Sequence, residues 1–452
     1  MKKLFSKPQK LHVDYRPFVK SFSLTTLVPS IKVQSLSACT FIQSLDLSTS
    51  PCLGADDLWI LVKKLANLTT LKILCSSSIG EEGFKTLSKA SNLAHLYLYA
   101  FDTQAIMERG LEHIATAATG LISFGLEYRQ RTRQDTRQGF EFTSMPSQDS
   151  LASLLCILID NHKGLKNLSL DWPLNVNQIM DHLISKKTQL ESLKLCNAKP
   201  TQISKFFQVC PGLKSLIFTE VYLTDPIDTV FVPLTSNHSP LISLTLNGVC
   251  TFTNLIPLIP CFTNLKTLVF SPSTRSASVL PTASASLLDI ANSCPFLEII
   301  SIPIYDNTNL LAFANGCPRL EQVDLQDGRG VDDVGILGLV SKCNRISKLS
   351  LGFASLSDDC AIQLGHYLKD SLVELHLPTN SRPLSPETVL LLLKQLVYLE
   401  KLANVAGDVL SISSLSTSLS ETRYLQELEF GGFVDPVVKE ELRKKVKFVT
   451  FV

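Results

Sequence analysis

The stretch Cys317–Leu325, which reads CPRLEQVDL, decides the fold of this chain. Its apolar residues Leu320, Val323 and Leu325 follow the spacing L-x-x-L-x-L, and a cysteine and a proline come directly before them. The same template with a cysteine ahead of it recurs after Cys210, Cys261, Cys294 and Cys343. Recurrence at a fixed period of about 20 to 50 residues is the signature of a repeat protein. The chain is therefore expected to be a stack of similar units.

Without the cysteine, the template runs along the whole chain in about seventeen units. The first apolar residue of each unit is Val19, Ile42, Leu68, Leu93, Leu121, Leu165, Leu190, Leu213, Leu241, Leu265, Leu297, Leu320, Ile346, Leu372, Leu399, Leu425 or Val446. Most spacings run from 21 to 28 residues, which matches the period of about 20 to 29 residues typical of leucine-rich repeats. Two spacings are longer, 44 residues after Leu121 and 32 residues after Leu265.

Each unit predicts one strand and one helix. Val323 and Leu325 alternate with polar residues, which indicates a strand whose apolar side chains point inward while Gln322 and Asp324 point outward. Apolar residues at helical spacing follow over 334–340, and they can pack over the strand. No unit can bury a core alone, so neighbours must stack. The predicted fold is a right-handed α/β leucine-rich-repeat solenoid, a curved horseshoe with a parallel sheet on its concave face and helices on its convex face.

The repeat pattern also predicts the domain organisation. Residues 1–17 form an N-terminal lead segment, and residues 18–452 form a single solenoid. Two insertions interrupt it, at 127–149 and at 271–286. The first insertion has no apolar period and contains Arg129, Arg131, Arg133 and Arg137. It is either a binding loop or a solvated insertion, because long loops are functional or disordered. The second insertion is rich in Ser, Ala, Pro and Thr, as flexible segments are.

Composition limits the classes of function. The chain has 452 residues, 45% of them hydrophobic, and a net charge of +1. A near-neutral charge gives no support for nucleic-acid binding, and no apolar run is long enough to span a membrane. We expect a monomer without cofactor or metal that binds a protein partner on its concave face.

The twelve cysteines are expected to be reduced thiols that serve packing. Cys210, Cys294, Cys317 and Cys343 share a place just before the strand, and Cys75 and Cys196 share one just after it. Free thiols indicate a reducing compartment, so the expected location is cytoplasmic or nuclear. The sequence contains no C-x-x-C pair, no P-loop, no G-x-S-x-G and no H-E-x-x-H. We therefore expect that the protein is not an enzyme.

The repeats resemble the cysteine-containing leucine-rich repeats of F-box proteins and their ribonuclease-inhibitor-like relatives, in their fungal form. The resemblance rests on the C-P-x-L steps at Cys210, Cys294 and Cys317, and on the opening LHVDYRPFVKSFSL. It implies protein recognition, as the substrate-binding part of an SCF-type ubiquitin-ligase receptor or of a relative without an F-box. The residues ahead of the first unit do not match an F-box, so an adaptor contact is implied only if an F-box lies upstream. The alternatives are a non-ligase scaffold or inhibitor of the ribonuclease-inhibitor type, and a regulator of a small GTPase.

Outward strand positions and the residues after them supply the candidate binding residues. Most outward residues are small and polar, but one region combines aromatic side chains with charges, as binding hot spots do. Its members are His95, Tyr97, Tyr99, Glu127, Tyr128, Asp171 and Trp172, next to the four arginines of the first insertion. The alternative is that these aromatic side chains cover their own loops. A second candidate surface comprises Gln322, Asp324, Gln326 and Asp327, with Lys348 and Glu374 nearby.

Overall fold

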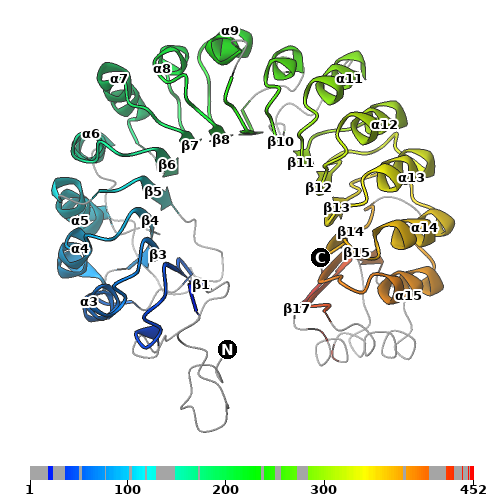
Figure 1. Cartoon of the computed structure of the whole chain (residues 1–452), viewed down its shortest axis with the longest axis horizontal. Helices are drawn as coiled ribbons and strands as arrows, with labels where there is room; N and C mark the ends of the chain where they lie inside the picture. The colour runs from blue at the N-terminus through cyan, green and yellow to red at the C-terminus, as the bar shows by residue number, and fades with distance from the viewer. Residues whose placement is uncertain are drawn as a thin grey trace. The chain divides into compact units, whose positions relative to one another are not determined.

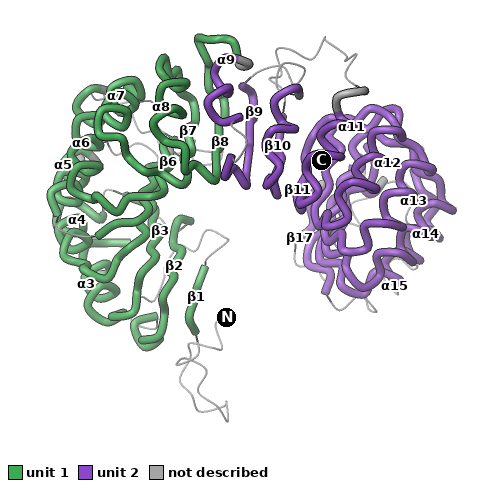
Figure 2. Tube along the Cα trace, turned by 45° about the horizontal axis from the view of Figure 1, so that its top comes forward, with its two compact units in different colours: residues 1–226 green, residues 227–452 purple. Residues whose placement is uncertain are grey.

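In the computed structural model, the chain forms two compact units, residues 1–226 (unit 1) and 227–452 (unit 2), coloured separately in Figure 2. The structure describes residues 19–23, 36–49, 53–76, 78–100, 104–117, 120–128, 148–171, 174–235, 239–249, 256–271, 284–379, 383–406, 424–431, 440, 446 and 448–451. The predicted lead segment, residues 1–17, lies outside these ranges. So do residues 129–147 and 272–283 of the two predicted insertions. The assignment of 18–452 to a single solenoid stays a prediction.

Unit 1 alternates strands with helices. Its strands are β1 (Ser21–Ser23), β2 (Ser44–Leu47), β3 (Thr70–Cys75), β4 (His95–Ala100), β5 (Ser123–Tyr128), β6 (Asn167–Asp171), β7 (Ser192–Cys196) and β8 (Ser215–Thr219). Its helices are α3 (Ala55–Lys64), α4 (Gly80–Ser88), α5 (Gln104–Thr116), α6 (Gln148–Asn161), α7 (Val176–Lys186) and α8 (Ile203–Val209). Consecutive strands pair in parallel from β1 with β2 through β7 with β8.

Unit 2 continues the alternation. Its strands are β9 (Ser243–Asn247), β10 (Thr267–Ser271), β11 (Ile299–Ser301), β12 (Gln322–Asp324), β13 (Lys348–Ser350), β14 (Glu374–His376), β15 (Lys401–Ala406), β16 (Glu427–Gly431) and β17 (Phe448–Phe451). Its α-helices are α9 (Ile227–Phe231), α11 (Ser284–Ser293), α12 (Asn307–Gly316), α13 (Asp333–Lys342), α14 (Asp358–Leu368) and α15 (Pro386–Gln395). Two 3₁₀ helices, η3 (Val232–Leu234) and η4 (Ile256–Cys261), occur early in the unit. All neighbouring strands from β9 to β17 pair in parallel.

The strands confirm the repeat prediction. Each of the predicted units contributes one strand, and the described residues contain seventeen strands, β1 to β17. In both units the helices lie on the outer side and the strands on the inner side (Figure 1). The chain is a leucine-rich-repeat protein built from α/β units. The repeat period follows from the spacing of the apolar residues, because each of them must lie in the core between a strand and a helix.

Side-chain burial alternates along the strands as the sequence pattern predicts. In β4, Leu96, Leu98 and Ala100 are buried, while the residues between them are only half-buried. In β12, Val323 is buried between the half-buried Gln322 and Asp324. The apolar positions therefore form the core under the helices. The alternate positions form the opposite face of the sheet, which we call the open sheet face.

The thiols of the repeated cysteines donate hydrogen bonds to carbonyl groups near the end of the helix in the preceding repeat. The thiol sulfur of Cys317 lies 3.6 Å from the carbonyl oxygen of Ala291 and 3.4 Å from that of Cys294. The thiol sulfur of Cys343 lies 3.7 Å from the carbonyl oxygen of Cys317. The last carbonyls of a helix lack intrahelical donors, and the thiols supply them. Burial raises the pKa of Cys317 to about 12 and that of Cys343 to about 11, so both stay protonated donors.

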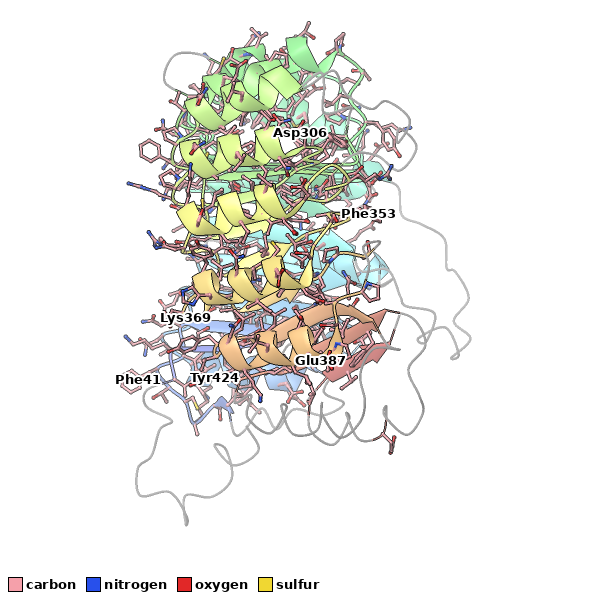
Figure 3. All side chains as sticks on the ribbon, turned by 90° about the vertical axis from the view of Figure 1, so that its right-hand side faces the viewer. Phe41, Asp306, Phe353, Lys369, Glu387 and Tyr424 are labelled. Atoms are coloured by element: carbon pink, nitrogen blue, oxygen red, sulfur yellow. The ribbon has the colours of Figure 1, made fainter. Side chains whose placement is uncertain are left out.

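The strand ends and the helix ends form two different edges of unit 2. Figure 3 labels Phe353, which follows β13, on one side, and Lys369 and Tyr424 on the other. At the edge where strands end and helices begin, polar side chains join neighbouring repeats. Asn307 donates to the carboxylate of Asp332 at 2.7 Å, and the backbone N–H of Ser385 donates to Asp358 at 2.9 Å. These bonds satisfy groups near the helix starts and fix the stacking of the repeats.

Two details differ from the sequence predictions. The residues at both ends of the second insertion, 271–286, are regular, because Ser271 ends β10 and Ser284 begins α11. Cys75 and Cys196 do not share one place in the repeat. Cys196 pairs with Asp171, whereas Cys75 pairs with Ala100, which is one register position further along the strand. The sequence already contains this offset, because Cys75 follows the template residue Ile73 by two positions and Cys196 follows Leu195 by one.

Candidate functional site

The open sheet face is the surface on which both predicted sites lie. Parallel sheets in proteins are almost always covered on both faces. In each unit the helices cover only the outer side of the strands (Figure 1). Among the described residues, outward strand residues and the residues that directly follow the strands form the open sheet face.

Tyr97 is a central residue of the open sheet face of unit 1. Its register neighbours are Lys72 on β3 and Gly125 on β5. The ammonium nitrogen of Lys72 lies 5.6 Å from the centroid of the Tyr97 ring. A methyl group added at Gly125 would lie 2.4 Å from the ring atom Cδ1 of Tyr97. The tyrosine ring therefore lies across the backbone of Gly125, in space that any larger residue would occupy.

Glu127 and Lys194 form an ion pair beside Tyr97 on the same face. The ammonium nitrogen of Lys194 lies 2.9 Å from Oε1 of Glu127, and the hydroxyl of Ser169 donates to the same oxygen at 3.1 Å. The side chain of Lys194 is 27% exposed, and that of Glu127 is 18% exposed. Burial alone would lower the pKa of Lys194, but the hydrogen bond and the charge of Glu127 raise it. The pair is therefore a fixed feature of the surface.

A polar cluster lies at the other end of the same strands. The hydroxyl oxygen of Ser123 lies 2.8 Å from Nδ1 of His95 and accepts a hydrogen bond from the side chain of Asn167 at 2.8 Å. These three residues occupy the same register position on β4, β5 and β6. These contacts hold the side chain of His95 in place.

The structure brings together five of the seven residues predicted for the first site. His95, Tyr97, Tyr99, Glu127 and Asp171 all occupy outward positions on β4, β5 and β6, and Tyr99, Glu127 and Asp171 are register neighbours. Tyr128 differs. It pairs with the buried Ala100 rather than with Tyr99. Successive positions on a strand face opposite sides of the sheet. The register position of Tyr128 is therefore not one of the outward positions that Tyr99, Glu127 and Asp171 occupy.

The remaining residues of the first prediction are Trp172, Arg129, Arg131, Arg133 and Arg137, and they lie outside the described residues. The described surface of unit 1, which we call the tyrosine surface, therefore comprises Lys72, Tyr97, Tyr99, Glu127 and Lys194.

The second predicted site borders an open depression of about 730 Å³ in unit 2. The residues around it are Asn247, Val269, Ser271, Ser301, Pro303, Tyr305, Asp324, Gln326, Asp327 and Phe353. Asp324 and Gln326, two residues of the second candidate surface, are among them, whereas Gln322 borders an adjoining depression of about 340 Å³. The two depressions share Val269, Ser301 and Asp324, so they form one continuous hollow of the open sheet face.

Hydrogen bonds fix the floor of the larger depression. The side-chain nitrogen of Gln326 donates to the carbonyl oxygen of Phe270 at 2.6 Å and to the hydroxyl of Ser301 at 3.0 Å. Asp324 accepts from the Ser301 hydroxyl at 2.8 Å and from the backbone N–H of Gln326 at 3.1 Å. At the rim, Nε of Arg329 lies 3.0 Å from Asp327, and its guanidinium lies 5.5 Å from the centroid of the Phe353 ring.

A ladder of alternating charges runs from β13 to β16 beside this hollow. Lys348, Glu374, Lys401 and Glu427 are consecutive register neighbours. Glu374 lies 3.0 Å from Lys348, 3.9 Å from Lys401 and 3.0 Å from His376. Burial alone would raise the pKa of Glu374, but the hydrogen bonds from Lys348 and His376 lower it. These charges neutralise one another, so the ladder has little net charge with which to attract a charged ligand.

The sequence patterns did not identify several residues of these surfaces. Lys72 and Lys194 occupy outward strand positions, and comparing the registers of neighbouring strands would have found them. Tyr305 and Phe353 follow strands in segments without an apolar period, so no pattern pointed to them. The space for the Tyr97 ring depends on Gly125, whose role is visible only in three dimensions.

Two searches for other kinds of site gave negative results for the described residues. No group of three or more His, Cys, Asp or Glu side chains among them could hold a metal ion. None of the helices in the described ranges is long and apolar enough to cross a membrane.

The chain was compared with known proteins. No family model matches the sequence, and no curated protein matches it. Among solved structures, it is similar to a chain of the yeast Rad7 and Elc1 complex, with 16% identity and a TM-score of 0.45, over 88% of this chain and 83% of that one. It is also similar to a chain of the TLR13–ssRNA13 complex, with 17% identity and a TM-score of 0.34, over 96% of this chain. The match spans 65% of that second chain, a little less than two thirds of its length.

Proposed function

We propose that this chain is a protein-recognition module whose partner binds the open sheet face. The observation that carries the proposal is the uncovered face itself. A parallel sheet normally has both faces covered, whereas in each unit the described helices lie on one face of the strands only (Figure 1). A protein partner is the covering layer that this architecture lacks.

The tyrosine surface supports a protein partner in particular. Tyrosine side chains are enriched where interfaces are strongest, because they combine a large apolar ring with a polar tip and lose little conformational entropy. Tyr97 is held between Lys72 and Gly125, so part of the entropic cost of ordering it on binding is already met in the free protein. The neighbouring pair of Glu127 and Lys194 adds polar groups that can set the orientation of a partner.

The test compares two matched triple variants in quantitative affinity capture from cells of the source organism. The sheet variant carries Lys72→Ala, Tyr97→Ala and Lys194→Ala. The helix variant carries Trp59→Ala, Ile157→Ala and Tyr367→Ala, three exposed residues on α3, α6 and α14. A partner retained by the wild type should be retained by the helix variant and reduced at least about tenfold by the sheet variant. Each partner is then purified and its binding is measured directly. Equal retention by both variants would refute the proposal.

The finer role that we propose is substrate binding for an SCF-type ubiquitin ligase. The support is the resemblance of the C-P-x-L steps to those of F-box proteins, in which Cys210, Cys294 and Cys317 are the matching residues. The test follows a partner identified by the sheet variant. Deleting the protein should lower ubiquitination of that partner and raise its abundance. An unchanged partner would instead favour the scaffold, inhibitor or GTPase-regulator roles, and it would leave recognition itself intact.

A further inference from the structure

The larger depression of unit 2 has more hydrogen-bond acceptors than donors. The Oδ1 atom of Asn247 is buried and accepts no hydrogen bond from the described residues. The Oδ1 atom of Asp327 is also buried, and it forms the ion pair with Nε of Arg329 at 3.0 Å. The amide donor of Gln326 is already used by Phe270 and Ser301. An unsatisfied buried acceptor is costly, so this hollow favours a ligand rich in donors.

The charges around the depression also favour a ligand rich in donors. Asp324 and Asp327 both border it, while Arg329, which pairs with Asp327, is 68% exposed at the rim. Burial raises the pKa of the Tyr305 hydroxyl, and the negative charge of Asp327 raises it further, although Arg329 partly opposes this. The hollow therefore has a negative potential, which would repel an anionic ligand.

The walls of the depression suit a flat cation. Tyr305 and Phe353 both border it, and cations bind favourably over the faces of aromatic rings. Arg329 of the chain itself shows the chemistry, because its guanidinium lies close to both Phe353 and the carboxylate of Asp327. A guanidinium can stack on a ring and offer five N–H donors in one plane, which an ammonium cannot do.

The backbone around the depression is closely packed. A methyl group added at Gly330 would lie 2.1 Å from the carbonyl oxygen of Tyr305, so the segments that follow β11 and β12 touch through their backbones. The backbone of these segments is therefore held in place before any ligand arrives. Such preorganisation lowers the entropic cost of binding.

We propose that this depression binds an arginine side chain presented by the partner polypeptide. The inference rests on the proposed function, because it assigns one contact of the partner that the open sheet face recognises. Asp324 and Asp327 supply the charge, Phe353 and Tyr305 supply the stacking walls, and Asn247 supplies an acceptor at the far side. The charges of the adjoining ladder, Lys348, Glu374 and Lys401, are paired with one another. The acidic hollow is therefore the distinctive charged feature of the open sheet face in unit 2.

The experiment uses the full chain and four acetylated, amidated probe peptides of the form Gly-Gly-X-Gly-Gly. Each carries a diazirine cross-linker, and X is arginine, lysine, citrulline or glutamate. Citrulline has the shape of arginine without its charge. Saturable cross-linking located by mass spectrometry should label the segments after β11, β12 and β13 with the arginine probe. Labelling should be at least about tenfold weaker with citrulline and clearly weaker with lysine.

Variants localise the effect. Asp324→Asn and Asp327→Asn should each weaken labelling by about fivefold. Asn247→Asp should strengthen it, because it adds a charge at the unsatisfied acceptor. Glu298→Gln is the control, since this carboxylate pairs with Lys266 away from the depression and should leave labelling unchanged. Thermal unfolding of each variant confirms that it is folded.

Equal labelling by citrulline, stronger labelling by glutamate, or labelling that maps outside the depression would overturn the proposal. Equal labelling by lysine would overturn the assignment to arginine. If the arginine probe fails while the sheet variant still loses its protein partner, only this inference fails. If the sheet variant retains every partner, recognition by the open sheet face fails as well.

Discussion

The open sheet faces of the two units have the same backbone pattern but different outward side chains. In unit 1, Tyr97 lies across Gly125, and two separate ion pairs are near it, Glu127 with Lys194 and Asp46 with Lys72. In unit 2, charges of opposite sign alternate from Lys348 to Glu427, and the hollow beside them has excess acceptors. The core residues are nearly interchangeable between the units. The outward residues therefore carry whatever specificity the repeats have.

The difference also concerns how the charges are satisfied. Among the described residues, Lys194 is the one cation paired with Glu127, whereas Glu374 has Lys348, Lys401 and His376 within ion-pair distance. A single pair depends on both members, while a ladder tolerates the loss of one. The two surfaces should thus respond differently to the same kind of substitution.

The largest effect should come from replacing two closely packed glycines. In Gly330→Ala the new methyl group meets the backbone oxygen of Tyr305 at 2.1 Å, which cannot move without shifting the chain. We expect the free energy of unfolding to fall by about 3 kcal/mol. In Gly125→Ala the obstacle is the ring of Tyr97, which can rotate away, so the loss should be less than about 1 kcal/mol. Urea unfolding measures both, and equal losses would contradict the account.

Removing the tyrosine ring should affect binding more than folding. Tyr97→Ala should lower the affinity for the protein partner by about 2 kcal/mol, as expected for a hot-spot residue. Gly125→Ala should reproduce part of this loss, because it displaces the ring without removing it. Calorimetric titration of the purified partner measures both variants. Unchanged affinity in Tyr97→Ala would exclude this residue from the interface.

The ion pairs give a smaller contrast in stability. Lys194→Met leaves Glu127, only 18% exposed, without its cation, and should cost about 1 to 2 kcal/mol. Lys348→Met leaves Glu374 with two other partners, and the lysine is 50% exposed, so the cost should stay below about 0.5 kcal/mol. Urea unfolding of the two variants tests the contrast. A larger loss in Lys348→Met would show that the ladder is not redundant.

The smallest effect should appear in acid. Hydrogen bonds from Lys166 and Lys214 lower the pKa of Glu191 from 4.5 to about 2 in the folded chain. Because the folded pKa is lowered, the pair stabilises the fold above pH 4.5 and loses its contribution as the pH falls from 4.5 to about 2. The melting temperature of Glu191→Gln should therefore decline less steeply than that of the wild type in this window. In Glu374→Gln the change should be smaller, since burial works against the ion pairs of Glu374. Identical slopes in all three proteins would contradict the assignment.

The sequence predicted the scaffold well because burial constrains it at every repeat. Leu320, Val323 and Leu325 must all reach one core, and that requirement sets both the period and the side of the sheet. The helix type was less predictable. The short segments η3 and η4 contain Pro233, Pro257 and Pro260; η3 follows directly after the short helix α9, and η4 lies where other repeats have an α-helix.

The candidate surfaces were only partly predictable because outward residues carry no burial constraint. The pattern placed Tyr97 and Asp324 on the open sheet face, but not their contacts with Gly125 and Ser301. Tyr128 was misplaced by one register position, since the template does not say where a strand ends. Whether Trp172 or the arginines after Tyr128 contribute to binding stays a prediction.

The most direct test of the account is site-specific photo-cross-linking of the captured partner. The photo-reactive amino acid p-benzoylphenylalanine is placed at Tyr97 or Ser350 on the open sheet face, and at Trp59 or Tyr367 on the helices. The account predicts cross-links to the partner from at least one of the two sheet positions and from neither helix position. Cross-links from the helix positions alone would contradict recognition by the open sheet face.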